Sequence, residues 1–209
     1  GMVGEGVLHS CLADERVAEV TVLTRRPTGE KHPKLTEVVV SDFLDLRGAE
    51  GDLTGYDACY FCAGVTSIGK SEQEYTRLTY TLTLSVATTL SGLNPGMVFC
   101  YVSGAGTDGT ENGKLMWARV KGKTENDLRK LPFRDVYLFR PGFLVASPDA
   151  RRTLRAYRYF RWLIPVIRLL APGRISSLEE MGRAMISVTS RGYEKPVLEV
   201  PDIKKASAR

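Results

Sequence analysis

Short apolar runs rich in β-branched residues alternate along this chain with longer segments in which apolar residues recur every three or four positions. The short runs have the length and composition of buried strands, and they lie at 17–23, 37–40, 56–62, 97–102 and 136–139. The longer segments have helical length, and they lie at 3–14, 71–91 and 114–131. Leu78, Leu82 and Val86 mark the apolar face of the second helix.

This alternation of strands and helices sets the expected architecture. Strand–helix–strand units connect by right-handed crossovers and give a doubly wound, mostly parallel sheet. The chain has 209 residues, of which 43% are hydrophobic, so residues 1–209 are expected to form a single α/β domain. Such a sheet binds its ligand at the carboxyl ends of its strands. The residues that follow each strand are therefore the candidates for a functional site.

The C-terminal part of the chain contains further predicted elements. They are a helix at 151–164 that Pro165 interrupts, a helix at 178–190 and a short strand at 196–200. Ser177 and Glu180 form a capping box in front of the second of these helices. Residues 202–209 are expected to form a loose basic tail.

The net charge of +5 is concentrated in one segment, because seven arginines and no acid lie between Arg151 and Ser177. In a helix, Arg151, Arg155 and Arg158 lie on one side and apolar residues on the other, which is the pattern of a lid packed against the core. Contact of the Arg151–Arg174 segment with a membrane surface is the alternative, and both explanations stay open. Nucleic-acid binding is not expected.

No feature of the chain indicates a secreted or membrane-spanning protein. The sequence has no run of about 18 apolar residues, and its N-terminus lacks the charged and apolar regions of a signal peptide. The expected location is cytoplasmic.

The four cysteines do not indicate a disulfide scaffold or a metal site. Cys59 and Cys62 form a C-x-x-C pattern within a predicted strand, where residues three apart point to opposite faces. Both are therefore expected to be core cysteines. The chain has only two histidines, neither of which is near a cysteine or carboxylate cluster, so no transition-metal site is expected.

The first six residues, Gly1 to Gly6, have the pattern of the second half of a glycine-rich dinucleotide loop. A complete loop follows a buried strand and delivers a pyrophosphate to the N-terminus of a helix. The helix is expected from Val3 onward, whereas no strand is expected before it. Either the flanking strands pair directly with each other, or a second chain fills the gap.

Thr24-Arg25-Arg26 follows the first predicted strand and carries the most specific cofactor signal after the glycines. An acid at this position would bind a ribose 2′-hydroxyl, whereas arginine suits a 2′-phosphate. The sequence therefore favours NADP over NAD. A solvated basic turn is the alternative interpretation.

Two more strand ends carry candidate cofactor contacts. Asp42 follows the second strand and is placed to reach an adenine edge, with Phe43 packing beside the ring; a helix N-cap is the alternative for Asp42. Ala63 and Gly64 follow the third strand and are small enough to let the backbone approach a ribose or nicotinamide, whereas a plain turn is the alternative there.

Several motifs together resemble an atypical short-chain dehydrogenase/reductase of the NAD(P)-binding epimerase/dehydratase-like group, which has a Rossmann fold. In chain order they are Gly-x-x-Gly, Thr-Arg-Arg, Ser-Asp-Phe, Cys-Ala-Gly, Tyr-Val-Ser-Gly-Ala-Gly, Val-Lys-Gly-Lys-Thr-Glu and Phe-Arg-Pro-Gly. The resemblance extends over nearly the whole chain, from Gly1 to about Pro201.

The resemblance implies roles for individual residues. Gly1 and Gly4 match two glycines of the cofactor loop, and Ser103 matches the serine that ends the active-site strand. Lys121 matches the lysine of Y-x-x-x-K, which in the family holds the nicotinamide ribose and lowers the pKa of the catalytic tyrosine. Pro141 and Gly142 match the turn that approaches the nicotinamide.

The chain departs from the family at the position of the catalytic tyrosine, which is Trp117 here. An indole donates a hydrogen bond but is no general acid or base near neutral pH. Tyr101 shares a strand face with Ser103 and is considered as a substitute, with a core position as the alternative.

Two functions from different classes follow. The first is an NADP-dependent oxidoreductase or nucleotide-sugar-epimerase-like enzyme acting on a small carbonyl or sugar-like substrate. The second is a non-catalytic cofactor-sensing or partner-binding protein that keeps the fold. The resemblance also implies a homodimer and assigns 143–209 to the substrate side of the domain. Because the first strand is not found, the 209-residue chain is expected to bind the cofactor weakly or not at all.

Overall fold

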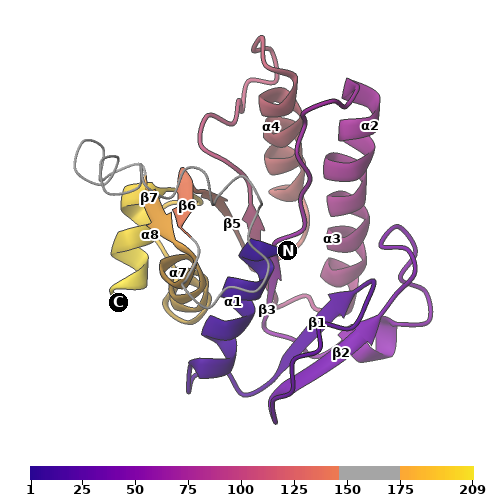
Figure 1. Cartoon of the computed structure of the whole chain (residues 1–209), viewed down its shortest axis with the longest axis vertical. Helices are drawn as coiled ribbons and strands as arrows, with labels where there is room; N and C mark the ends of the chain where they lie inside the picture. Colours follow the sequence, from indigo (N-terminus) through magenta and orange to yellow (C-terminus); the bar gives the residue numbers. More distant parts are fainter. Residues whose placement is uncertain (146–174) are drawn as a thin grey trace.

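A computed structural model describes residues 1–145 and 175–209 of the chain. Its strands are β1 (Val20–Thr24), β2 (Leu35–Val39), β3 (Ala58–Phe61), β4 (Val98–Val102), β5 (Asp135–Arg140), β6 (Phe143–Val145), β7 (Ile175–Ser177) and β8 (Val197–Glu199). Its helical segments are α1 (Met2–Ala13), the 3-10 turn η1 (Glu50–Leu53), α2 (Glu72–Thr76), the π-helical turn η2 (Arg77–Thr81), α3 (Leu82–Leu93), α4 (Met116–Leu128), α7 (Leu178–Arg191) and α8 (Val200–Ser207). The helices lie on both sides of the strands (Figure 1).

All strand pairs that the structure describes are parallel, which confirms the predicted α/β class. The largest sheet has the order β3-β4-β5-β8, and separate two-stranded sheets are formed by β1 with β2 and by β6 with β7. Among the described residues, β1 pairs only with β2 and β3 pairs only with β4. Direct pairing of β1 with β3, one of the two closures considered from the sequence, is therefore not observed.

The two faces of the main sheet carry separate cores. One core joins α1, α7 and α8 to β4 and β5, and the other joins α3 and α4 to the opposite face. Cys62 packs in the first core and Cys59 in the second, so the prediction that the two sulfurs diverge is confirmed. Both cysteines are free thiols.

The predicted helix at 71–91 forms as a continuous helical segment with a π-helical turn in its middle. Ser71 caps its start, where the hydroxyl accepts a hydrogen bond from the Glu74 amide at 3.2 Å. The turn η2 inserts one extra residue into the helical repeat, which rotates the residues that follow relative to those before it. Tyr75 before the turn and Val86 after it are both buried.

Two expectations for the C-terminal part have different outcomes. The capping box is confirmed, because the Ser177 hydroxyl accepts from the Glu180 amide and the Glu180 carboxylate accepts from the Ser177 amide. The loose tail at 202–209 is wrong, because residues up to Ser207 belong to α8. Ile203 and Ala206 are three residues apart, lie on one helical face and are fully buried against the core.

The predicted helix at 151–164 and its arginines lie outside the described residues. The short strands β6 and β7 on either side of this segment were not expected. They pair in parallel with each other, with Phe143 opposite Ile175, and so bring residues from the two ends of the segment together.

Glycines allow α1 and α7 to pack closely side by side. A Cβ atom on Gly6 would lie 2.5 Å from the Leu178 side chain, and one on Gly182 would lie 2.3 Å from the Ser10 hydroxyl. Gly6, at the end of the glycine-rich start of the chain, therefore serves helix packing. This role was not predicted from the sequence.

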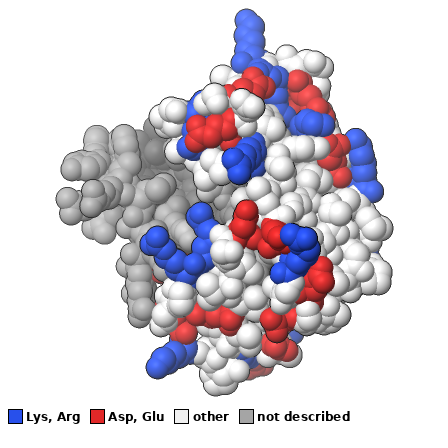
Figure 2. Space-filling view, turned by 90° about the vertical axis from the view of Figure 1, so that its right-hand side faces the viewer, with Lys and Arg blue, Asp and Glu red and all other residues white. Residues whose placement is uncertain are grey.

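The right-hand side of the molecule in Figure 1 carries interleaved charges rather than a patch of one sign (Figure 2). Ion pairs at α2 and α4 join opposite charges, for example Lys70, just before α2, with Glu74 and Lys123 with Asp127 on α4. A surface of mixed charge neutralises itself locally and presents no extended basic field.

The packing of α1 on α7 predicts that Gly6→Ala and Gly182→Ala each destabilise the protein by about 1–3 kcal/mol, because the added methyl group forces the helices apart. Gly92→Ala is the matched control, since a Cβ on Gly92 in α3 has nothing within 4 Å. That control should stabilise by about 0.4–1 kcal/mol. Urea denaturation measures all three variants, and equal stability of Gly6→Ala and Gly92→Ala would contradict the assignment.

Candidate functional site

The predicted site residues lie at the carboxyl ends of parallel strands. They end or follow β1 (Thr24, Arg25, Arg26), β2 (Asp42, Phe43), β3 (Ala63, Gly64), β4 (Ser103) and β5 (Pro141, Gly142), and they are joined by Gly1 and Gly4 at the start of α1 and Lys121 from α4. Because the strand pairs are parallel, the ends of β3, β4 and β5 share one edge of the main sheet, and those of β1 and β2 share one edge of the smaller sheet. Their roles in binding or catalysis remain predictions.

The N-terminus of α1 has no side-chain cap. Glu5 closes the first turn, its amide donating to the Gly1 carbonyl at 2.9 Å, so the amides before it keep their free N–H groups. Gly4 lies against β3, where a Cβ atom would lie 3.6 Å from that of Cys62. An uncapped helix start with partial positive charge is suited to an anion.

Arg25 and Arg26 are exposed, and their guanidinium groups have no partner among the described residues. Thr24 fixes the turn that carries them, because its hydroxyl donates to the Arg26 carbonyl at 2.7 Å. Unpaired guanidinium groups on a fixed turn are available to a phosphate.

Asp42 makes a local turn, accepting a hydrogen bond from the Leu44 amide through Oδ1 at 2.9 Å. The aspartate thus caps a turn, but no helix begins there, so the predicted helix N-cap is not observed. Its side chain is exposed, and Phe43 packs partly against the core beside α3.

The ends of β3 and β5 carry small or rigid residues. Ala63 and Gly64 are exposed, and no atom lies within 4 Å of a Cβ built on Gly64. Pro141 is buried, and its carbonyl accepts a hydrogen bond from the Ala105 amide at 3.1 Å. This bond holds the turn at Pro141 and Gly142 against the loop that follows β4.

Ser103 is buried at the end of β4, and its hydroxyl lies 2.9 Å from that of Thr107. Thr107 has one hydroxyl hydrogen, which it donates to the Gly104 carbonyl at 2.8 Å. Ser103 must therefore donate its own hydrogen to Thr107. The Ser103 oxygen consequently faces a ligand as an acceptor only.

Lys121 lies on α4 above the end of β4. Its Nζ is 3.4 Å from the Val102 carbonyl and 5.3 Å from the centre of the Tyr101 ring. Burial lowers the pKa of Lys121 to about 8, against a smaller opposing effect of Glu125. An amine with such a pKa exchanges protons near neutral pH.

Tyr101 and Trp117 both contribute packing here. Tyr101 is 1% exposed and belongs to the core beneath α4, and burial raises the pKa of its phenol further above the ordinary value. The alternative of a core tyrosine is thus the observed one. Trp117 lies against the loop after β4, its ring 3.5 Å from a Cβ placed on Gly106.

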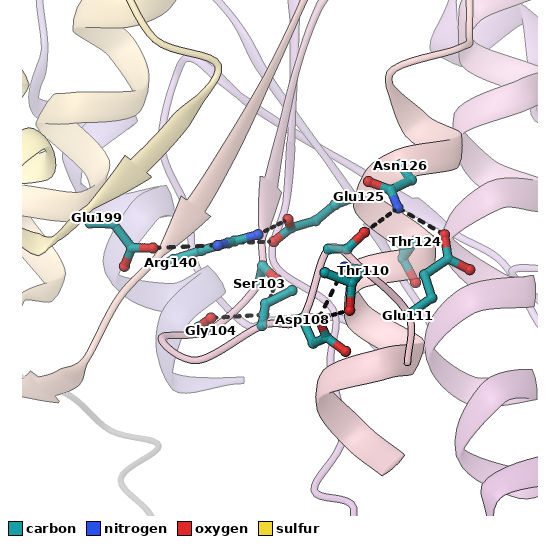
Figure 3. Close-up of polar contacts among 12 residues, drawn as sticks. Ser103, Gly104, Asp108, Thr110, Glu111, Thr124, Glu125, Asn126, Arg140 and Glu199 are labelled. Atoms are coloured by element: carbon teal, nitrogen blue, oxygen red, sulfur yellow. Dashed lines mark hydrogen bonds and ion pairs between the residues drawn. The ribbon is translucent and has the colours of Figure 1, made fainter. Parts of the chain in front are cut away.

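The loop at 104–113 is held tightly on α4 (Figure 3). Asn126 donates to the Gly109 carbonyl at 2.9 Å and to Glu111 at 2.8 Å. The closest approach is at Gly122, where a Cβ atom would lie 1.8 Å from the Asp108 carbonyl oxygen. Gly122, one residue after Lys121, was not identified from the sequence, and a glycine inside a predicted helix was the available signal.

A buried ion pair lies behind Lys121 and was also missed. The Glu125 carboxylate, which is 2% exposed, accepts from Arg140 Nε at 3.0 Å and from a terminal nitrogen of the same guanidinium at 2.5 Å. Arg140 also reaches Glu199 at 3.5 Å (Figure 3). A charged residue at 125 on an otherwise buried helix face was the signal in the sequence.

The chain is similar in sequence to fungal proteins named for mitochondria. It is 28% identical over 162 residues to the Aspergillus oryzae protein fmp52-1, mitochondrial, covering 75% of this chain and 67% of that protein. It is 26% identical over 167 residues to the Emericella nidulans protein fmp52, mitochondrial, covering 77% and 70%. No protein-family model matches the chain.

Solved structures show the fold. Glucuronic acid dehydrogenase from Chromohalobacter salexigens superimposes with a TM-score of 0.65 at 13% identity, covering 95% of this chain and 72% of that one. The Bordetella bronchiseptica enzyme WbmH in complex with NAD+ superimposes with a TM-score of 0.62 at 16% identity, covering 91% and 69%. The chain therefore has a Rossmann-like α/β fold.

The expected cytoplasmic location is contradicted by the fmp52 relatives, whose names place them in mitochondria. The sequence argument relied on the absence of a secretory signal and did not address import into an organelle. Within residues 1–145 and 175–209, none of the helices has the length and hydropathy needed to cross a membrane.

The buried amine predicts a pH-dependent cost of folding. Burial lowers the folded-state pKa of Lys121 from 10.5 to about 8. Below pH 8 the charged amine therefore lowers the free energy of unfolding by its full amount, and this destabilisation disappears as pH rises towards 10.5. Lys121→Met should therefore stabilise the protein at pH 7, by up to about 3 kcal/mol, and much less at pH 10.5. Urea denaturation at both pH values measures the difference.

Lys123→Met is the control for this prediction. Lys123 is exposed on the same helix, and its hydrogen bond to Asp127 raises the pKa of its amine. Its removal should leave stability unchanged or slightly reduced at pH 7. A less stable Lys121→Met variant at pH 7 would show that the amine is not buried at a cost.

Proposed function

We propose that this chain binds NADP and acts as an oxidoreductase or epimerase-like enzyme on a small carbonyl or sugar-like substrate. Its Rossmann-like fold, shared with enzymes such as WbmH in complex with NAD+, supports the proposal. The observation that carries the proposal is that the candidate residues lie at the carboxyl-terminal edge of parallel strands, at the start of α1 or, for Lys121, beside the end of β4. Ligands of doubly wound sheets bind at this edge.

Three features of the edge fit a dinucleotide. The uncapped start of α1 suits a pyrophosphate, and the open space at Gly64 suits a ribose or nicotinamide. The unpaired groups of Arg25 and Arg26 suit a 2′-phosphate, which supports NADP over NAD. The cofactor would supply the hydride, and Lys121 would donate a hydrogen bond to the reacting oxygen of the substrate, while the Ser103 oxygen would accept one from a substrate hydroxyl.

We also propose that one more parallel strand lies between β1 and β3. Each of these strands has one edge without a partner among the described residues. A hydrogen bond between the hydroxyls of Thr21 on β1 and Tyr56 just before β3 shows that the two strands lie near each other at that end. Buried backbone groups require partners, and a strand leading into α1 would supply them together with the phosphate loop.

A cofactor sensor without catalysis is the second candidate, and Trp117 favours it. An indole occupies the position where the family has its proton-donating phenol, and its ring packs on Gly104 and Gly106. The two candidates share cofactor binding and differ in turnover.

Cofactor preference tests the 2′-phosphate assignment. We expect the chain to bind NADPH more tightly than NADH in isothermal titration calorimetry. Replacing both Arg25 and Arg26 with alanine should weaken NADPH binding about 10- to 100-fold and leave NADH binding nearly unchanged, because charge-assisted hydrogen bonds are lost. Arg129→Ala, at the far end of α4, is the control, and equal losses for both cofactors would contradict the assignment.

The proposed strand predicts weak binding by the 209 residues alone. Extending the chain before Gly1 by about ten residues that form an apolar strand should strengthen NADPH binding and raise the melting temperature. An extension of equal length made of glycine and serine is the control. If the 209-residue chain already binds NADPH tightly, or if both extensions act alike, the proposed strand is wrong.

Turnover separates the two candidates. We expect absorbance loss at 340 nm when the extended chain is incubated with NADPH and a panel of carbonyl and sugar-derived substrates. Tight NADPH binding without consumption across the panel would favour the sensor instead.

A further inference from the structure

We propose that the Lys121 ammonium replaces the absent phenol as the proton donor to the substrate oxygen. The inference rests on the proposed reductase function and assigns the proton in that reaction to one group.

The donors of the other candidate groups are unsuitable. The Ser103 hydrogen is committed to Thr107, whose own hydrogen is committed to the Gly104 carbonyl. The Tyr101 phenol lies within the core below α4. Trp117 donates through its indole nitrogen but does not release that proton near neutral pH.

The Lys121 ammonium has N–H groups that make no hydrogen bond within the described residues. An ammonium has three N–H groups, and the only hydrogen bond of Lys121 among the described residues is the long one, 3.4 Å, to the Val102 carbonyl. This contact holds Nζ next to the residue before Ser103. The remaining N–H groups are free to donate to an oxygen that sits beside the Ser103 hydroxyl.

Charged and titratable groups on three elements hold Lys121 in a state that exchanges protons. Glu125 follows one turn later on α4 and opposes the loss of the charge, while the Tyr101 ring contacts the amine from β4. Arg140 from β5 occupies both carboxylate oxygens of Glu125. Glu125 is therefore only a partial counter-ion, and burial lowers the pKa of Lys121 to about 8.

Addition of a hydride to the carbonyl carbon leaves an electron pair and negative charge on the oxygen. An Nζ–H bond of Lys121 breaks and an O–H bond forms on the substrate, so an alcohol and a neutral amine result. The amine regains its proton from water. The reverse sequence applies to oxidation of an alcohol.

Competitive labelling with trace acetic anhydride tests the amine without any turnover. Acetylation of each lysine is followed from pH 6 to 11 by peptide mass spectrometry, and the half-maximal pH gives its titration. We expect Lys121 to titrate near pH 8 and Lys123, which is paired with Asp127, well above it. A Lys121 that titrates with Lys123, or that stays unlabelled at every pH, overturns the proposal.

Two variants of the residues around Lys121 are expected to shift its titration in opposite directions. Glu125→Gln removes the counter-ion and should move the Lys121 titration to lower pH. Arg140→Gln frees the Glu125 carboxylate and should move it to higher pH. Unfolding of either variant would move the Lys121 titration towards the pH at which an exposed lysine titrates. Opposite shifts in the two variants therefore cannot arise from loss of structure. Shifts of the same sign overturn the arrangement.

Turnover gives the second readout. Lys121→Arg keeps a positive donor but cannot release its proton near neutral pH, so kcat should fall about 100-fold or more while the NADPH Kd changes little. Introducing a phenol by Trp117→Tyr in that background should recover part of the loss. Lys123→Arg is the control. These measurements use the chain extended before Gly1. Unchanged kcat in Lys121→Arg overturns the inference, whereas absence of NADPH binding in the extended chain defeats the proposed function instead.

Discussion

The burial of β4 on both faces is the constraint that organises this molecule. Val98, Phe99 and Cys100 are fully buried, with the first and third facing the core of α1 and α7 and the second facing the core of α3 and α4. A strand enclosed in this way needs partners on both edges, which β3 and β5 supply. Its end is therefore fixed, and with it the position of Ser103.

The packing of helix α4 against β4 and the loop after it also fixes the position of Lys121 in the candidate site. Because Gly122 has no side chain, α4 lies directly against the loop after β4. One turn later on α4, Asn126 donates a hydrogen bond to the same loop. Lys121 is thereby pressed against β4 in a place where its charge is poorly solvated. The polar groups of the site are thus fixed by backbone packing and do not depend on flexible surface loops.

Buried charge is the cost of this arrangement. An ion pair such as that of Glu125 and Arg140 loses hydration on burial and regains most of it through paired hydrogen bonds. Lys121 has no such partner, because the carboxylate nearest to it is already occupied. Replacing Lys121 with an apolar residue would raise the stability of the folded state. A lysine kept at such a cost to stability favours a function at the end of β4.

Local pattern was enough to determine the α/β class, the parallel strands, most helix and strand positions and the placement of the candidate residues at strand ends. Alternating periodicities and strand-end chemistry are local properties, so they can be recognised in a single chain. The helix α8, the pair β6 and β7 and the roles of Gly6 and Gly122 were missed because each depends on contacts between distant segments. Sequence identified Ser103 and Lys121 as candidates, but only the tertiary structure decided that Ser103 is an acceptor and that Lys121 is a buried amine. Hydrogen-bond direction and desolvation are set by neighbours in space, which the order of residues does not show.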